Sequence, residues 1–283
     1  MATSLSLDLM SSYNKESLGY LNKDEIKIAS CLSYSKAISF LKGEDTKKRA
    51  LAAFYFSINF DNKDSKILIN SLKNEKKLYV RLYLQRALQK GNKETLNYLV
   101  ESIPLFFRSP FLKPTKKKTY PLPRNLIIRI ISHMNPNLFL EIKNMYLSSS
   151  IKIKEELIEA LGFMCYHHFT LQKDDVYDFF LKQIDGNSDI LTRRVITALT
   201  CFKNIKTLLF LDGLKGILPS SFHDEIKRSI SVITPTALLN CPNIKTIIAT
   251  KYFQSNEVKK LYKIGFRDFG ENRVDSFLKK KNR

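Results

Sequence analysis

Three consecutive lysines lie in a segment rich in proline and aromatic residues, between two stretches that have helical spacing. Residues 104–123 read PLFFRSPFLKPTKKKTYPLP, in which the lysine run is Lys116, Lys117 and Lys118. The aromatic residues of this segment are Phe106, Phe107, Phe111 and Tyr120. Ammonium groups pair with phosphates while aromatic rings stack on bases, so this combination is suited to binding a single-stranded nucleic acid. The alternative is a surface loop whose aromatic rings pack against the edge of neighbouring helices.

The net charge of the chain is +20, since 47 Lys and Arg residues face 27 Asp and Glu residues. Such a surface attracts polyanions, because lysines placed near phosphates release counterions. Lysine greatly outnumbers arginine, however, and asparagine, isoleucine and phenylalanine are abundant, which is the compositional bias of an AT-rich genome. A nucleic acid is therefore one candidate partner, and generic solvated lysine is the other explanation of the charge.

The histidines and cysteines show no spacing typical of a metal site or a nucleophile. The histidines are His133, His167, His168 and His223. The adjacent pair points to different faces of a helix end, so the two imidazoles cannot easily share one metal, and we expect no metal. The cysteines are Cys31, Cys165, Cys201 and Cys241. Each is isolated in or beside an apolar stretch, which predicts buried free thiols in a reducing compartment.

Apolar residues recur at helical spacing from Lys23 to about Thr234, and only 9 glycines and 9 prolines interrupt the whole chain. This pattern predicts helices joined by short turns. The expected helices lie within 26–41 (one or two helices), 46–60, 65–72, 78–89, 93–103, 124–134, 137–147, 152–166, 174–184, 191–202, 206–214 and 223–232.

The second helix of each successive pair has a common pattern: a charged start, an aliphatic residue near the middle and then Ala-Leu. Ala87, Ala160 and Ala198 occupy the alanine position, where a small side chain lets a neighbouring helix approach closely. Equivalent positions recur about every 30 to 43 residues. Over residues 64–232 the pattern resembles HEAT and armadillo repeats. The resemblance implies an α-solenoid whose second helices line a concave binding face. Some HEAT-like proteins are DNA glycosylases with a tryptophan-lined cleft, but this chain has no tryptophan.

The pattern changes after Thr234, where we expect the helical rhythm to stop. A β-branched apolar run and a second short run predict strands, and each is followed by a helical segment. The expected order is strand 244–253, helix 257–264, strand 266–272 and basic helix 273–281. Strand-helix-strand-helix is the unit of a parallel α/β fold.

The stretch TIIATKYFQSNEVKKLYKIGFRDFGENRVDSFLKK resembles the start of the YggS-type pyridoxal-phosphate homeostasis family, barrels related to the N-terminal barrel of alanine racemase. Two motifs carry the likeness over residues 245–280: Ala-Thr-Lys at the end of the first strand and Phe-Gly-Glu-Asn-Arg-Val after the second. The resemblance implies that Lys251 forms a Schiff base with pyridoxal 5′-phosphate and that Asn272 helps to shape the cofactor pocket. Barrel active sites do lie at the carboxyl ends of strands, and an apolar setting makes a lysine amine more nucleophilic.

A complete barrel of this kind needs about eight strands and ~250 residues, whereas two strands precede Arg283. The likeness is therefore to a truncated barrel. The segment is a degenerate remnant packed on the last helices, or another chain completes the barrel, or the gene product continues.

The sequence therefore predicts a mostly α protein, an α-solenoid of HEAT-like helix pairs followed by a short C-terminal α/β segment. We expect a flexible N-terminus over 1–22, the helical-repeat domain over 23–234 and the incomplete α/β segment over 235–283. The pattern favours a non-catalytic binding scaffold with a protein partner; the alternatives are a pyridoxal-phosphate-binding protein acting through Lys251 and a nucleic-acid-binding protein. The chain shows no secretory signal and no apolar run long enough to span a membrane, so we expect a cytoplasmic protein without a membrane partner.

Overall fold

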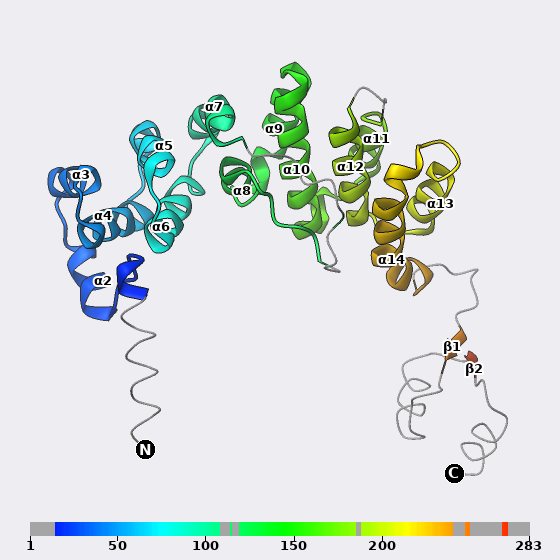
Figure 1. The fold of residues 1–283 in the computed structure, drawn as a ribbon, viewed down its shortest axis with the longest axis horizontal. Coiled ribbons are helices and arrows are strands. Elements are labelled where there is room, and N and C mark those ends of the chain that lie inside the picture. Colours follow the sequence, from blue (N-terminus) through cyan, green and yellow to red (C-terminus); the bar gives the residue numbers. More distant parts are fainter. Residues whose placement is uncertain are drawn as a thin grey trace, which may run out of the picture. The chain divides into compact units, whose positions relative to one another are not determined.

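The computed structural model describes residues 15–107, 114, 119–184, 188–239, 247–249 and 268–270 (Figure 1). Two compact units make up the chain, Met1–Cys201 and Phe202–Arg283, and each is described by itself. The described part is mostly α-helical, as the sequence predicts. The predicted repeat domain 23–234 extends over parts of both units.

Apart from the segment between Phe106 and Leu126, most helices of the first unit follow one another with short connections. They are α2 Lys23–Ser30, α3 Tyr34–Lys42, α4 Thr46–Ile58, α5 Ser65–Asn74, α6 Leu78–Leu88, α7 Lys93–Ser102, α8 Leu126–Ile131, α9 Phe139–Ser148, α10 Ile151–His167, α11 Asp174–Leu181 and α12 Asp189–Ala198. Short 3-10 helices lie at Asn62–Asp64, Ile103–Phe106, Pro136–Leu138, Phe169–Leu171 and Leu199–Cys201. The second unit contains α13 Ile205–Leu214, the 3-10 helix Ser220–Phe222, α14 His223–Leu239, and the strands β1 Ile247–Ala249 and β2 Asp268–Gly270.

Local capping signals fix where several of these helices begin. The Asp45 carboxylate accepts hydrogen bonds from the backbone amides of Lys47 and Lys48 at the start of α4. Asn92 does the same for the first amides of α7. These side chains satisfy amides that have no partner within the helix, so the sequence sets the boundary without help from distant residues.

The helices of the first unit form two layers, which are visible in Figure 1. The first helices of the pairs, α3, α5, α7, α9 and α11, form one layer, and the second helices, α4, α6, α8, α10 and α12, form the other. Within the second layer, α4 packs on α6, α6 on α8, α8 on α10 and α10 on α12. This arrangement is compatible with a helical-repeat fold.

Small residues bring the second helices together. Ala87, Ala160 and Ala198 are all fully buried, in agreement with the pattern predicted for these helices. The tightest approach is at Gly162 of α10, where an added Cβ would lie 2.8 Å from the Cβ of Ala198 on α12 and 2.1 Å from the hydroxyl oxygen of Tyr120. A side chain at position 162 would therefore force α10 away from its neighbours.

Polar contacts join successive helix pairs along the first layer. The Tyr34 hydroxyl donates to Asp64 at 2.7 Å, and the Thr95 hydroxyl donates to the Asn62 side chain at 2.9 Å. Farther along, Lys93 forms an ion pair with Glu141 at 2.8 Å, and the Tyr146 hydroxyl donates to Gln183 at 2.8 Å. Each of these contacts links one helix pair to the next, so the layer has a defined register.

Two sequence predictions are wrong. The helical rhythm does not stop after Thr234, because α14 continues through Pro235 to Leu239. A proline removes a single backbone donor, and the helix tolerates that loss here. Cys31 is exposed rather than buried, because it lies just after the last turn of α2. Cys165 and Cys201 are buried, and burial raises the pKa of the Cys165 thiol; Cys241 lies outside the described residues.

The strands β1 and β2 pair in parallel, with Ile247 opposite Asp268 and Ala249 opposite Gly270. They fall within the two predicted strands 244–253 and 266–272. The predicted helices 257–264 and 273–281 lie outside the described residues, so the strand-helix alternation stays a prediction. None of the described helices combines the length and apolar character that crossing a membrane requires.

Replacing Gly162 with alanine should destabilise the first unit by about 1 to 3 kcal/mol, because the new methyl group collides with Tyr120 and Ala198. The measurement is denaturant unfolding followed by circular dichroism. Gly43→Ala is the control in the same unit, because its Cβ would meet no atom closer than 3.4 Å, and a change within about 0.5 kcal/mol is expected for it. Equal effects of the two substitutions would contradict the close packing of α10.

Candidate binding site between the first helix pairs

A hollow of about 520 Å³ lies where the turn between α3 and α4 faces α5. It is lined by Leu41, Lys42, Gly43, Arg49, Ile67, Asn70, Ser71, Asn74 and Glu75. The lining therefore combines two aliphatic side chains with amides, a hydroxyl and charged groups.

Helical spacing places one wall of the hollow. Ile67, Asn70, Ser71 and Asn74 follow the i, i+3, i+4, i+7 spacing of a helix, so they share one face of α5. The Ser71 hydroxyl donates to the Ile67 carbonyl at 2.9 Å within the helix. Asn70 and Asn74 are exposed, so their side-chain amides are open to a ligand.

The opposite wall is held by Arg49 of α4. Its Nε donates to Glu75 at 2.7 Å, and its Nη2 donates to the other carboxylate oxygen at 3.4 Å. Its Nη1 donates to the carbonyls of Gly43, at 3.2 Å, and Glu44. One guanidinium thus joins the turn before α4 to the turn before α6, and we call this set of contacts the Arg49 staple.

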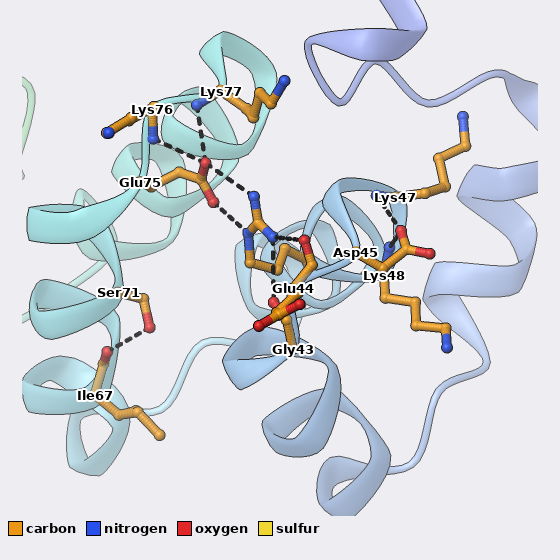
Figure 2. A network of polar contacts seen from close by, with 11 residues as sticks. Gly43, Glu44, Asp45, Lys47, Lys48, Ile67, Ser71, Glu75, Lys76 and Lys77 are labelled. Carbon is orange, nitrogen blue, oxygen red and sulfur yellow. Dashed lines mark hydrogen bonds and ion pairs between the residues drawn. The ribbon is translucent and has the colours of Figure 1, made fainter.

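Glu75 completes the Arg49 staple from the far side. Its Oε1 accepts hydrogen bonds from the backbone amides of Lys76, at 2.9 Å, and Lys77, at 2.8 Å (Figure 2). Burial raises the pKa of the Glu75 carboxyl, but hydrogen bonds from Arg49 and these amides outweigh burial and lower the pKa below its ordinary value. The ionised form is therefore favoured, and its stabilisation is present above pH 4.5 and is lost as the pH falls through the folded-state pKa.

Basic residues predominate around the hollow. Segments 42–49 and 73–77 contain seven basic and three acidic residues. Two of the basic side chains are neutralised by ion pairs: Arg49 binds Glu75, and Lys47 binds Glu25. Lys42, Lys73 and Lys76 are exposed. The arrangement can attract an anionic group and donate hydrogen bonds to it.

The junction between α10 and α12 has a comparable arginine, Arg194. Both Nη atoms of Arg194 donate to one oxygen of Glu156 at 3.0 Å, and Glu159 lies 3.9 Å from Nη2. Burial raises the pKa of Glu159, and the nearby charge of Arg194 opposes that rise. These side chains join α10 to α12, and the charge of Arg194 is paired there with carboxylates of α10. Among the described residues, no group of three or more His, Cys, Asp or Glu side chains is arranged to hold a metal ion.

The proline-rich segment 104–123 is only partly described. Tyr120 is buried against Phe163 and Tyr166, with ring centroids 5.9 and 5.4 Å apart, whereas Phe107 is exposed. Tyr120 therefore packs against the neighbouring helix α10, as expected for a surface loop whose aromatic rings contact the edge of the helices. Lys116, Lys117 and Lys118 lie outside the described residues, so a nucleic-acid contact there stays a prediction.

The predicted cofactor residues, Lys251 and Asn272, also lie outside the described residues. Each follows a strand by two positions, Lys251 after β1 and Asn272 after β2. Sequence reasoning missed the hollow altogether. The sequence shows Asn70 and Asn74 four residues apart on one expected helix, but no local pattern indicates that the turn before α4 lies opposite them.

Replacing Arg49 with alanine should cost about 3 kcal/mol of unfolding free energy at neutral pH, because the Glu75 charge is left in a half-buried place without its partner. The difference from the unchanged protein should shrink as the pH falls below 4.5, because a protonated Glu75 no longer needs the guanidinium. Denaturant unfolding at several pH values measures both effects. Lys27→Ala, which breaks a fully exposed ion pair with Asp24, should cost less than about 1 kcal/mol at every pH. A pH-independent Arg49→Ala effect would show that the ion pair does not stabilise the turns.

No family model, no curated protein and no solved structure matches this chain. The resemblances to HEAT-like repeats and to the pyridoxal-phosphate family therefore rest on the residues of the chain itself.

Proposed function

We propose that this chain is a non-catalytic binding scaffold of HEAT-like helix pairs and that its partner is another protein. The observation that carries the proposal is the hollow between two successive pairs, lined by polar and aliphatic side chains. Stacked repeats contact mainly their neighbours, so their outer surfaces remain available over a long distance for a partner.

Rigidity of the array supports this proposal. The Arg49 staple and the polar contacts of the first layer hold neighbouring helix pairs in one register. A surface that is already ordered loses less conformational entropy when a partner binds, so more of the contact energy appears as affinity. Contacts that hold helix pairs in one register would oppose a rearrangement of these pairs during a reaction.

Site-directed photo-crosslinking in the cells that produce the protein tests the scaffold. A photoreactive amino acid is placed at one of three exposed positions on the helix pairs: Lys73, Leu82 or Leu140. We expect the same protein to be crosslinked from positions in at least one of the two layers. Lys73 of α5 and Leu140 of α9 report on the first layer and Leu82 of α6 on the second, so a comparison of crosslinking yields at Lys73 and Leu82 identifies the layer that the partner contacts. Ile217, which is exposed on the second unit, serves as the comparison position. Absence of any specific protein adduct from all three positions would contradict a protein-binding scaffold.

A pyridoxal-phosphate-binding function is the second candidate, because the register of the two strands favours it. Ala249 and Gly270 are partners in a parallel pair, so both strands reach their carboxyl ends together. Lys251 and Asn272 follow these ends by two positions each, as expected for residues on one rim of a barrel. In this proposal the Lys251 amine holds the cofactor, and the cofactor supplies a carbonyl that reacts with amines.

Incubation of the full chain with pyridoxal 5′-phosphate, followed by borohydride reduction and peptide mapping, tests this second function. We expect a visible absorbance band and a reduced pyridoxyl group on Lys251, both lost in Lys251→Ala and retained in Lys245→Ala. Labelling spread evenly over many lysines would mean that the segment has no specific cofactor site.

A further inference from the structure

We infer that the hollow between the α3–α4 turn and α5 binds an acidic, extended peptide segment. This inference rests on the proposed function and names the chemistry of the partner at that site. It follows from three features of the hollow: the spacing of two asparagines, the charge around them and the chemical character of the lining.

The asparagine spacing matches an extended peptide. Asn70 and Asn74 are four residues apart on α5 and both are exposed, so their side chains are separated by about 6 Å along the helix. Every second residue of an extended strand is separated by about 6.6 Å, and its side chain faces the same way. Each asparagine amide offers both a donor and an acceptor, which is the complement of one backbone peptide group. The pair is therefore able to bind two peptide groups of one extended chain.

The charge around the asparagines selects an acidic sequence. Lys42 lines the hollow, and Lys73 and Lys76 lie beside it on exposed positions. Glu75, the acidic group of the lining, is already bound by Arg49 and two backbone amides. Acidic side chains that alternate along the peptide would meet this basic rim, which speeds association and excludes basic sequences.

The lining distinguishes a peptide from a nucleic acid. Among the described residues that line the hollow there is no aromatic ring; its apolar members, Leu41 and Ile67, are aliphatic. Binding of single strands relies on aromatic rings that stack on bases, whereas aliphatic side chains suit the small apolar groups of a peptide. A phosphodiester also has no donor for the acceptor oxygens of Asn70 and Asn74.

Fluorescence anisotropy with the full chain tests the inference. The probe is a fluorescein-labelled octapeptide of alternating glutamate and threonine, and the matched probe has glutamine in place of glutamate. A fluorescein-labelled oligothymidine of the same net charge is the third probe. We expect the acidic peptide to bind at least tenfold more tightly than both others, with an affinity that falls as salt is raised.

Variants locate the binding. The double substitution Asn70→Ala and Asn74→Ala should weaken the acidic peptide at least tenfold, while circular dichroism stays unchanged because alanine favours the helix. Asn97→Ala, an exposed asparagine on α7 outside the hollow, is the control and should leave affinity unchanged. Equal affinity in the double variant, tighter binding of the oligothymidine, or no peptide binding at low salt would each overturn the inference. Crosslinking to a protein partner that persists in the double variant would overturn the hollow as the site while leaving the scaffold intact.

Discussion

Alanine and glycine residues on the second helices allow these helices to lie directly against one another, and the arrangement of the first unit depends on that contact. Gly162 of α10 gives space to Ala198 of α12, and three fully buried alanines line α4. Dispersion and the removal of apolar surface from water act over the whole line of contact, so the second layer stacks continuously. The first helices then cover one side of this layer, and their own contacts are more polar.

Two arginines on second helices, Arg49 in the first turn of α4 and Arg194 in the middle of α12, form ion pairs with different surroundings. Arg49 reaches forward along the chain to Glu75, whereas Arg194 reaches back to Glu156. The first contact ties two turns together at the surface and leaves a hollow beside it. The second is enclosed between helices, where a charge must be paired because it is removed from water. The side chains of the two pairs are about equally exposed, 19% and 4% for Arg49 and Glu75 against 18% and 10% for Arg194 and Glu156, so the difference lies in which elements each pair joins.

The C-terminal strands raise a separate physical question. Among the residues that the structure describes, β1 and β2 pair with each other alone, and a pair of three-residue parallel strands is not stable by itself, because both faces and both outer edges need partners. Something must cover them, whether further residues of this unit or another molecule. A cofactor-binding function requires that the carboxyl ends of the strands, at Ala249 and Gly270, stay accessible to the cofactor. A purely structural role has no such requirement.

Local sequence patterns are sufficient to specify the helices and many of their starting points. The spacing of apolar residues indicates α4, α6 and α10 because a helix repeats every 3.6 residues, and Asp45 and Asn92 cap helices through amides only two or three residues away. The alanine pattern of the second helices also indicated the close packing later seen at Ala198. These features depend on neighbours in the chain, so they can be recognised without knowledge of the fold.

The hollow, the exposure of Cys31 and the continuation of α14 through Pro235 depend on how the helices pack, and local patterns do not indicate them. Arg49 and Glu75 are 26 residues apart, and no local pattern states that their turns meet. An apolar or charged residue has several possible neighbours until the helices are packed, and small differences in helix orientation change which of them it contacts. Position in the array, rather than residue type, therefore determines which polar side chains form the candidate site.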